Sequence, residues 1–417
     1  MPESNERRMI VRARTVVTMD GAPIENGAVA ISGNQIADVG KFDEIRTRNA
    51  GEIVDLGEQV LLPGLINAHC HLDYTCLRGE IPPQKSFADW IRAINAEKAK
   101  LLPKDYLTSI NEGFAEAKRF GTTTIANLTA FPELVPKINA PIRSWRFAEL
   151  IDVRAPDRAS EIVDLAIESL KSAHNWGLAP HALFTASKDL YRRCEKIARR
   201  ENILLTTHLA ESGEEMKMFR DASGRLYGFL KSIGRDMSDC GRQTPLELFI
   251  GAPGGRALPH WIVSHLNELT ESDFDLLERS ERRFHVVHSP RSHDYFKHSR
   301  FRFEKLHALG FNICLGTDSL ASNENVSLFA EMRAFQRCER GISPREILKL
   351  ITVNPARALH QENTLGGIRP GFRADLIALP CKQPRNTFEE IMAFDGTIDW
   401  MIMNGDVTRS SERGGSP

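Results

Sequence analysis

LLPGLINAHCH, residues 61–71, is an apolar run that ends in two histidines on either side of one cysteine. A strand buried on both faces has such a continuous apolar sequence and is typical of a parallel sheet. On a strand, the side chains of residues i and i+2 point to the same side, so His69 and His71 can reach one metal ion. This stretch therefore predicts a buried parallel strand that carries polar chemistry at its carboxyl end.

Seven further β-rich stretches follow it, at 121–128, 143–152, 179–187, 203–212, 261–267, 284–290 and 311–319. Longer amphipathic stretches separate them, and this alternation is typical of βα units around a parallel sheet. A helix is expected over 105–121, with Leu107, Ile110, Phe114 and Ala117 on one face, and another after Ser187 as its N-cap. Eight such units predict an α/β fold, a (β/α)₈ TIM-like barrel over residues 61–361.

Short strands return at both ends of the chain. The segments 9–21, 27–40 and 52–64 near the start, and 374–380 and 399–408 near the end, are rich in β-branched and apolar residues and carry turn signals. We expect residues 1–60 and 362–417 to form one small β-sandwich domain. The polar, glycine-rich end from residue 410 is expected to be a frayed tail.

Charge and composition narrow the classes of function. Lys plus Arg is 54 and Asp plus Glu is 55 in 417 residues, a formal net charge of −1, which gives no reason to expect nucleic acid or a membrane surface as a partner. No apolar run approaches the roughly 20 residues of a membrane span, and the start lacks a secretory signal. The seven cysteines lack CxxC spacing, so we expect a cytoplasmic protein without disulfides.

Two other strand stretches end in residues that bind metals. His208 closes the stretch at 203–212, and Asp318 closes the one at 311–319. With His69 and His71 they offer three imidazoles and one carboxylate, a set suited to one divalent transition metal, Zn²⁺ or else Fe²⁺. His208 alone would be interpreted as a hydrogen-bonded core histidine, but four such residues at strand ends favour a metal site.

Three more histidines lie at similar strand ends, His181, His265 and His288. Five of the others fall in expected helices or loops and are interpreted as surface residues: His174, His260, His298, His307 and His360.

The motifs resemble the amidohydrolase superfamily and, within it, the Atz/Trz-type aminohydrolases and chlorohydrolases. The resemblance runs nearly from end to end and rests on PGLINAHCHLDYTCLRG (63–79), PHALFTAS (180–187), HLAESGEE (208–215), SHLNEL (264–269), HSPRSH (288–293), LGTDSLASN (315–323) and the closing stretch 352–377. Together these motifs are specific for the family and much less so for the substrate.

The resemblance implies a role for each of these positions. The four metal-competent residues would hold a single divalent metal that carries the attacking water. Asp318 would also accept the proton of this water, and His265 would orient it. Glu211 would carry a proton to the ring nitrogen beside the attacked carbon, although a carboxylate in a helix first turn is the alternative. His181 would contact the substrate. Two-metal relatives usually carry a bridging lysine at the end of the fourth strand, but here Lys188 falls beyond it, at an expected helix start.

The surroundings of HSPRSH look closest to aminodeoxyfutalosine deaminases, although nucleoside-deaminating relatives usually have Asn where His293 stands. Arg291 and His293 would face the substrate or anchor a loop. The segment 87–100 would form a lid in which Phe87 and Trp90 pack on a flat base, or a helix in which both pack into the core. Relatives are often homodimers.

The sequence thus predicts a hydrolytic deaminase of an aminated nitrogen heterocycle, with an adenine-containing nucleoside such as aminodeoxyfutalosine as the small-molecule substrate. A guanine- or triazine-type aminohydrolase or a chlorohydrolase is the alternative on the same site. A third alternative is a barrel without activity that serves as a scaffold, but scaffolds of that kind usually lose ligands that this chain retains.

Overall fold

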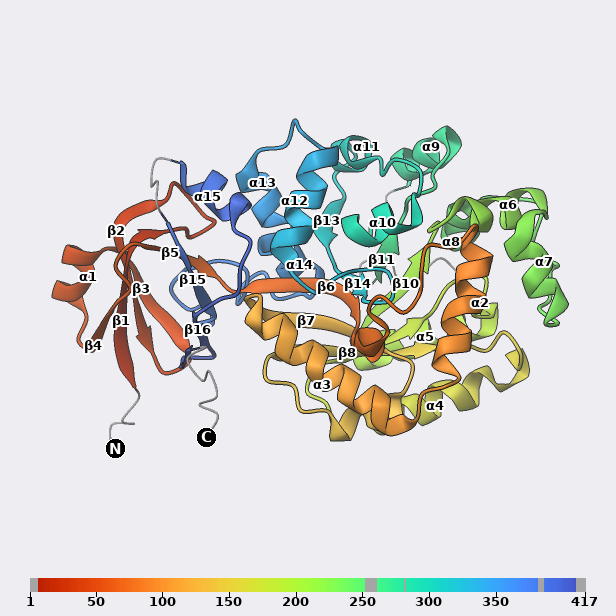
Figure 1. Cartoon of the computed structure of the whole chain (residues 1–417), viewed down its shortest axis with the longest axis horizontal. Helices are drawn as coiled ribbons and strands as arrows, with labels where there is room; N and C mark the ends of the chain where they lie inside the picture. The colour runs from red at the N-terminus through yellow and green to blue at the C-terminus, as the bar shows by residue number, and fades with distance from the viewer. Residues whose placement is uncertain (1–6, 252–260, 281–282, 382–385, 410–417) are drawn as a thin grey trace.

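The computed structural model describes residues 7–251, 261–280, 283–381 and 386–409, and contains two separate β-sheets (Figure 1). The expected tail from residue 410 and the expected surface residue His260 lie outside this part of the chain. None of the described helices combines the length and the apolar character that a membrane crossing requires.

The larger sheet has nine parallel strands in the order β13-β12-β11-β10-β9-β8-β7-β6-β14. They are β6 (Leu65–His71), β7 (Thr122–Thr129), β8 (Arg143–Leu150), β9 (Trp176–Pro180), β10 (Leu204–Leu209), β11 (Trp261–His265), β12 (His285–His288), β13 (Asn312–Leu315) and β14 (Asp318–Ser319). β14 starts three residues after β13 ends and pairs with β6, at the opposite end of the strand order. The sheet therefore curls into a TIM-barrel-like fold.

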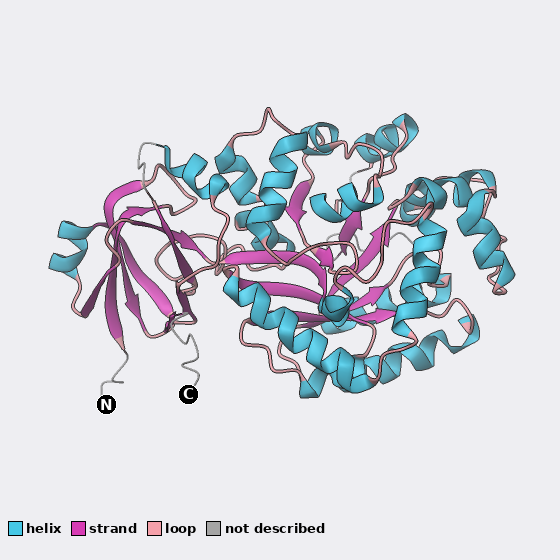
Figure 2. Cartoon of the chain, viewed as in Figure 1, coloured by secondary structure: helices cyan, strands magenta, loops and turns pink. Residues whose placement is uncertain are grey.

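Burial explains the sequence of these strands. Every residue of β6, β7, β10 and β11 is buried, and helices surround the sheet that these strands form (Figure 2). Polar residues within such strands therefore need a partner or a function, since an unpaired buried polar group costs about 1–3 kcal/mol.

Helices follow most strands of this sheet, and two of them test the expected patterns. In α3 (Pro103–Arg119) Ile110, Phe114 and Ala117 are buried as expected, whereas Leu107 is only partly buried. The Ser187 side chain accepts a hydrogen bond from Leu190 N and caps α5 (Lys188–Glu201), which confirms the expected N-cap.

The other helices around this sheet are α2 (Phe87–Lys98), α4 (Ala159–Leu170), α6 (Gly213–Asp221), α7 (Gly224–Ser232), α8 (Pro245–Ile250), α9 (Glu271–Arg279), α10 (Pro290–Phe296), α11 (Phe303–Ala308), α12 (Leu328–Cys338), α13 (Pro344–Lys349) and α14 (Val353–Ala358). Three short 3₁₀ helices are η1 (Leu72–Leu77), η2 (Pro132–Lys137) and η3 (Pro156–Arg158).

The second sheet combines strands from both ends of the sequence, at the left of Figure 1. Its order is β17-β16-β15-β5-β1-β2-β3, with β4 on β1. The strands are β1 (Arg8–Val16), β2 (Ile24–Ser32), β3 (Gln35–Lys41), β4 (Glu52–Asp55), β5 (Gln59–Pro63), β15 (Leu376–Pro380), β16 (Trp400–Met403) and β17 (Asp406–Arg409). Two helices accompany it, α1 (Phe42–Arg48) and α15 (Thr387–Ala393). Val11, Leu61 and Trp400 share its apolar core, so residues from both ends of the chain bury one another.

Candidate active site

Three histidines from two distant strands meet at the carboxyl ends of the parallel sheet. His69 and His71 lie on β6 and His208 on β10, and all three are buried. Each offers a ring nitrogen within 4.8 Å of the others, and His71 Nε2 lies 3.1 Å from His208 Nε2. The alternation of side chains along β6 brings both of its histidines to this point, as the sequence predicts.

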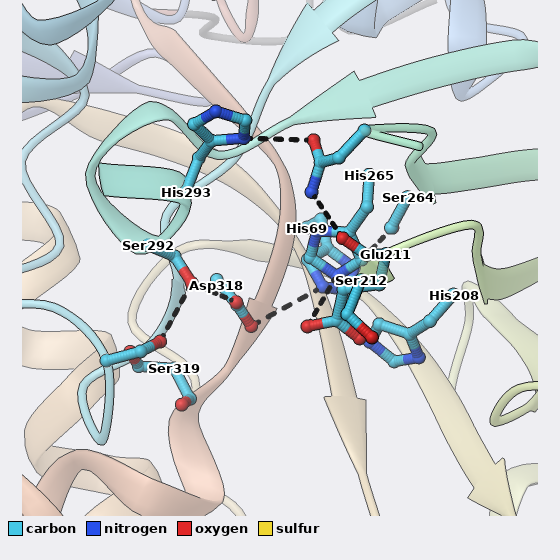
Figure 3. A network of polar contacts seen from close by, with 12 residues as sticks. His69, His208, Glu211, Ser212, Ser264, His265, Ser292, His293, Asp318 and Ser319 are labelled. Carbon is cyan, nitrogen blue, oxygen red and sulfur yellow. Dashed lines mark hydrogen bonds and ion pairs between the residues drawn. The ribbon is translucent and has the colours of Figure 1, made fainter. Parts of the chain in front are cut away.

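Asp318 completes this group from β14, the strand that pairs with β6. Its Oδ1 lies 3.7 Å from His69 Nε2 and 3.8 Å from His71 Nε2, and its Oδ2 accepts a 2.6 Å hydrogen bond from Ser292 Oγ (Figure 3). Burial opposes ionisation of this carboxyl, yet the neighbouring His69 and His265 keep its pKa well below its usual range. Asp318 is therefore a carboxylate at neutral pH.

Contacts at Nδ1 orient the imidazoles of His208 and His69, with Nε2 of each toward the group. His208 Nδ1 lies 2.8 Å from the His181 carbonyl oxygen, which can only accept, so Nδ1 carries the proton and Nε2 keeps its lone pair. His69 Nδ1 lies 3.0 Å from Ser264 Oγ, while its buried Nε2 has no hydrogen-bond partner among the described residues. Burial also lowers the pKa of His208, to about 4, and that of His71 well below its usual value. Neutral imidazole nitrogens and one carboxylate fit a divalent transition metal.

Glu211 and His265 lie beside this group. Glu211 Oε1 is 3.8 Å from His265 Nε2, and the rings of His208 and His265 stack with centroids 5.3 Å apart. Burial, followed by the charges of Asp318 and Glu215, raises the pKa of Glu211 well above its usual value. The shift favours the protonated form of Glu211, whereas the opposite shift of the neighbouring Asp318 favours its carboxylate.

The turn after β10 that carries Glu211 is held by buried polar groups. Glu215 accepts hydrogen bonds from Ala210 N and Glu211 N, at 3.2 and 2.8 Å. Ala210 has a φ of +49°, a left-handed conformation that non-glycine residues rarely adopt. Asn267 Nδ2 donates to the Glu211 carbonyl oxygen, and its Oδ1 contacts His293 Nδ1 at 3.1 Å.

Above these residues lies a cavity of about 160 Å³ with aromatic walls. His181, Trp90 and Phe296 line it, and α2, which carries Trp90, covers one side. His181 directly follows β9, and its Nε2 lies 4.0 Å from Glu149 Oε1. Trp90 also packs against Phe296, with ring centroids 4.8 Å apart. It therefore lines the cavity and packs against its neighbours at once, the two roles that the sequence left as alternatives.

Other candidate residues lie away from this cavity. The Arg291 guanidinium bonds to Asn325 and Glu324, which favours its interpretation as a loop anchor. His293 is held by Asn267, and His288 is buried against the Phe301 ring. Lys188 is the first residue of α5, as expected.

The structure differs from the sequence prediction at one histidine and adds one buried carboxyl group that the sequence prediction did not include. His298, expected at the surface, is only partly exposed, because its ring packs against those of Phe87, Phe296 and His293. Glu149, the penultimate residue of β8, was not singled out. It is buried 3.6 Å from His71 Nδ1, and burial raises its pKa to about 8. A charged residue near the end of an apolar strand was the signal that could have revealed it.

Comparisons with known proteins agree with this geometry. The model of the amidohydrolase family matches residues 60–408. The 5-methylthioadenosine/S-adenosylhomocysteine deaminase of Syntrophobacter fumaroxidans is 31% identical over 88% of this chain and 82% of its own length. The 5′-deoxyadenosine deaminase of Methanocaldococcus jannaschii is 27% identical over 91% of this chain and 90% of its own.

Solved structures show the same fold. An adenosine deaminase of Xanthomonas campestris with bound zinc has a TM-score of 0.78 at 22% identity and covers 96% of this chain and 92% of its own. The aminofutalosine deaminase of Helicobacter pylori in complex with methylthio-coformycin has a TM-score of 0.84 at 18% identity. The match covers 96% of this chain and 100% of that one. With most of its length matched by the family model and by a relative above 30% identity, the chain belongs to the amidohydrolase family.

Proposed function

We propose that this chain hydrolyses the exocyclic C–N bond of an adenine nucleoside with a modified 5′ position and releases ammonia. One observation carries the proposal: the imidazoles of His69, His71 and His208 converge within 4.8 Å of one another beside the Asp318 carboxylate, and Glu211 lines the same cavity as His71, His208 and Asp318. The relatives at 31% and 27% identity are named as deaminases of 5′-modified adenosines, which supports this substrate class.

The residues proposed to hold the metal are His69, His71, His208 and Asp318. Zn²⁺ suits this set best, and Fe²⁺ is the alternative. When bound, a divalent ion of this kind lowers the pKa of water from about 15.7 toward about 7 and so supplies a nucleophile at neutral pH.

The remaining steps belong to the protein's side chains. Asp318 takes a proton from the attacking water, which His265 orients, as the C–O bond forms at the amino-bearing carbon. Glu211 gives its proton to the adjacent ring nitrogen, which makes that carbon electrophilic. The C–N bond then breaks, the amino group leaves as ammonia with the proton that Asp318 had taken, and the new hydroxyl becomes a carbonyl as its proton returns to Glu211. His181 and Trp90 are proposed to contact the base.

We further propose that β13 and β14 act as one interrupted strand, which would make the parallel sheet an eightfold barrel over residues 61–361. Residues 1–60 and 362–417 would form the composite β-sandwich domain. The scattered cysteines favour a cytoplasmic location.

A deamination screen tests the proposal. The zinc-loaded protein is offered adenosine, 5′-deoxyadenosine, 5′-methylthioadenosine, S-adenosylhomocysteine and aminodeoxyfutalosine, and then guanine and aminated or chlorinated triazines. We expect the adenine absorbance to shift, with one ammonia released per nucleoside consumed. Turnover of guanine or triazines alone would replace the proposal with the alternative on the same site.

A further inference from the structure

One wall of the cavity holds polar groups that the proposed mechanism does not use. Lys98, the last residue of α2, and Tyr74, in η1, both line the cavity. The Lys98 ammonium lies over the Tyr74 ring, 4.7 Å from its centroid. The Tyr74 side chain is buried, and its hydroxyl has no hydrogen-bond partner among the described residues.

Lys98 is the only lysine or arginine among the described residues that line this cavity. Within the described ranges no carboxylate oxygen comes within 4.0 Å of its ammonium group, although Glu149 and Asp73 are close enough to influence its pKa. Burial lowers that pKa, because the ammonium has lost part of its hydration. A partly desolvated cation with no ion pair, next to an unpartnered hydroxyl, is suited to bind an anion.

A location at the end of a helix offers a simpler explanation, since a lysine in the last turn favours the helix dipole. That effect operates equally well from a side chain that points into solvent. It explains neither why the ammonium lies over Tyr74 inside the cavity nor why the Tyr74 hydroxyl lacks a partner.

The reaction centre sets the direction of the substrate. The amino-bearing carbon must lie near Glu211 and His265, at the ends of β10 and β11, so the sugar extends toward the other walls of the cavity. Lys98 is on one of these walls, near enough for its charge to act on His181. The 5′ substituent is the part of an adenosine that extends away from the amino group and toward these walls.

We propose, on the basis of the proposed function, that Lys98 and Tyr74 form a subsite for an anionic group on the 5′ substituent of the substrate. The substrate class would be adenosines whose 5′ extension ends in an anion, in preference to those with a neutral one. A carboxylate and a phosphate are both anions of this kind that accept hydrogen bonds. Lys98 would provide the charge, and the Tyr74 hydroxyl would donate a hydrogen bond.

The test compares kcat/KM for three adenosines that differ at the 5′ position. S-adenosylhomocysteine carries a carboxylate, adenosine 5′-monophosphate a phosphate, and 5′-deoxyadenosine no charge. Each is measured with the zinc-loaded wild type, Lys98→Met, Lys98→Arg and Lys104→Met. Lys104 is an exposed lysine at the start of α3, so its substitution removes the same charge away from the cavity.

We expect wild type to prefer an anionic compound over 5′-deoxyadenosine and Lys98→Met to reduce this ratio by about tenfold or more, mainly through KM. Lys98→Arg should retain most of the preference, Lys104→Met should leave it intact, and added salt should weaken it. Whichever anion shows the Lys98-dependent preference identifies the group.

Equal ratios in wild type and Lys98→Met would overturn the subsite and leave the deaminase proposal standing. A wild type that turns over none of the three compounds would instead overturn the proposed function and the subsite with it.

Discussion

Asp318 is in an unusual conformation for a residue at a strand end. Its φ of +54° is left-handed, although its neighbour in β14 continues the pairing with β6. The turn aims its Oδ1 at His69 and His71 while Ser292 holds Oδ2. Because Ser292 binds Oδ2, the other oxygen, Oδ1, can bind a metal ion or accept a proton.

We predict that Asp318→Asn lowers kcat by about 10²–10⁴-fold, because the amide cannot take the proton of the attacking water. Ammonia release at saturating substrate measures the effect. Ser292→Ala is the matched control: it removes the hydrogen bonds of this hydroxyl to Oδ2 and to Ser322 Oγ but keeps the carboxylate, and it should cost much less. An Asp318→Asn variant as active as wild type would remove this residue from the mechanism.

Glu149 should make the stability of the metal-free protein depend on pH. Burial raises its pKa from 4.5 in the unfolded chain to about 8 in the folded one. Between these values the folded chain keeps a proton that the unfolded chain has lost. The stability that Glu149 contributes is therefore fully present below pH 4.5, its pKa in the unfolded chain. It is lost as the pH rises through about 8, its pKa in the folded chain.

Relative to Glu149→Gln, the free energy of unfolding of wild type should fall as pH rises across this window, by at most about 1.4 kcal/mol per pH unit. Urea unfolding of both proteins, with divalent ions removed, measures the difference. Parallel pH profiles for the two proteins would show that the Glu149 pKa is not raised.

At the scale of elements, the turn between β10 and α6 decides where Glu211 lies. β10 ends at Leu209, and Ser212 caps α6 by accepting from Glu215 N. The two intervening N–H groups both donate to the Glu215 carboxylate, so one buried side chain satisfies both donors of this connection.

We predict that Glu215→Ala destabilises the fold by about 2–6 kcal/mol, because two buried donors lose their acceptor at about 1–3 kcal/mol each. It should also lower kcat, since Glu211 is no longer held. Urea unfolding and ammonia release measure the two effects. Lys217→Ala, at an exposed position of the same helix, should change neither. Unchanged stability in Glu215→Ala would mean that water replaces the carboxylate.

At the scale of the whole molecule, the proposed metal would join distant parts of the chain. His69 and His71 lie on β6, His208 on β10 and Asp318 on β14, so one ion would link strands that are far apart in sequence. An ion that binds the folded chain alone stabilises it by mass action.

We predict close to one transition metal per chain by elemental analysis. Chelation should lower the melting temperature, and added Zn²⁺ should restore it, with a gain of about 2.7 kcal/mol when the free ion is about 100 times its Kd. A His208→Ala variant should respond far less. Two metals per chain would contradict the single site and point to the second group of potential ligands, Glu149, His181 and His208.

The sequence alone predicted the parallel sheet and the residues that converge at its carboxyl edge. Each buried strand is a local apolar run, and a polar residue that ends such a run is visible without knowing its neighbours. Those positions include His69, His208 and Asp318, which the fold brings together because parallel strands end at one edge. The family motifs supplied the expected roles of Glu211 and His265.

Only the tertiary structure brought Lys98 over Tyr74, Glu149 beside His71, and His298 against Phe87 and Phe296. In sequence, Lys98 is an ordinary helix-end lysine and His298 an ordinary loop histidine. Whether such a side chain is solvated or buried depends on which helix or loop folds over it, and that is set by long-range packing that no local pattern encodes.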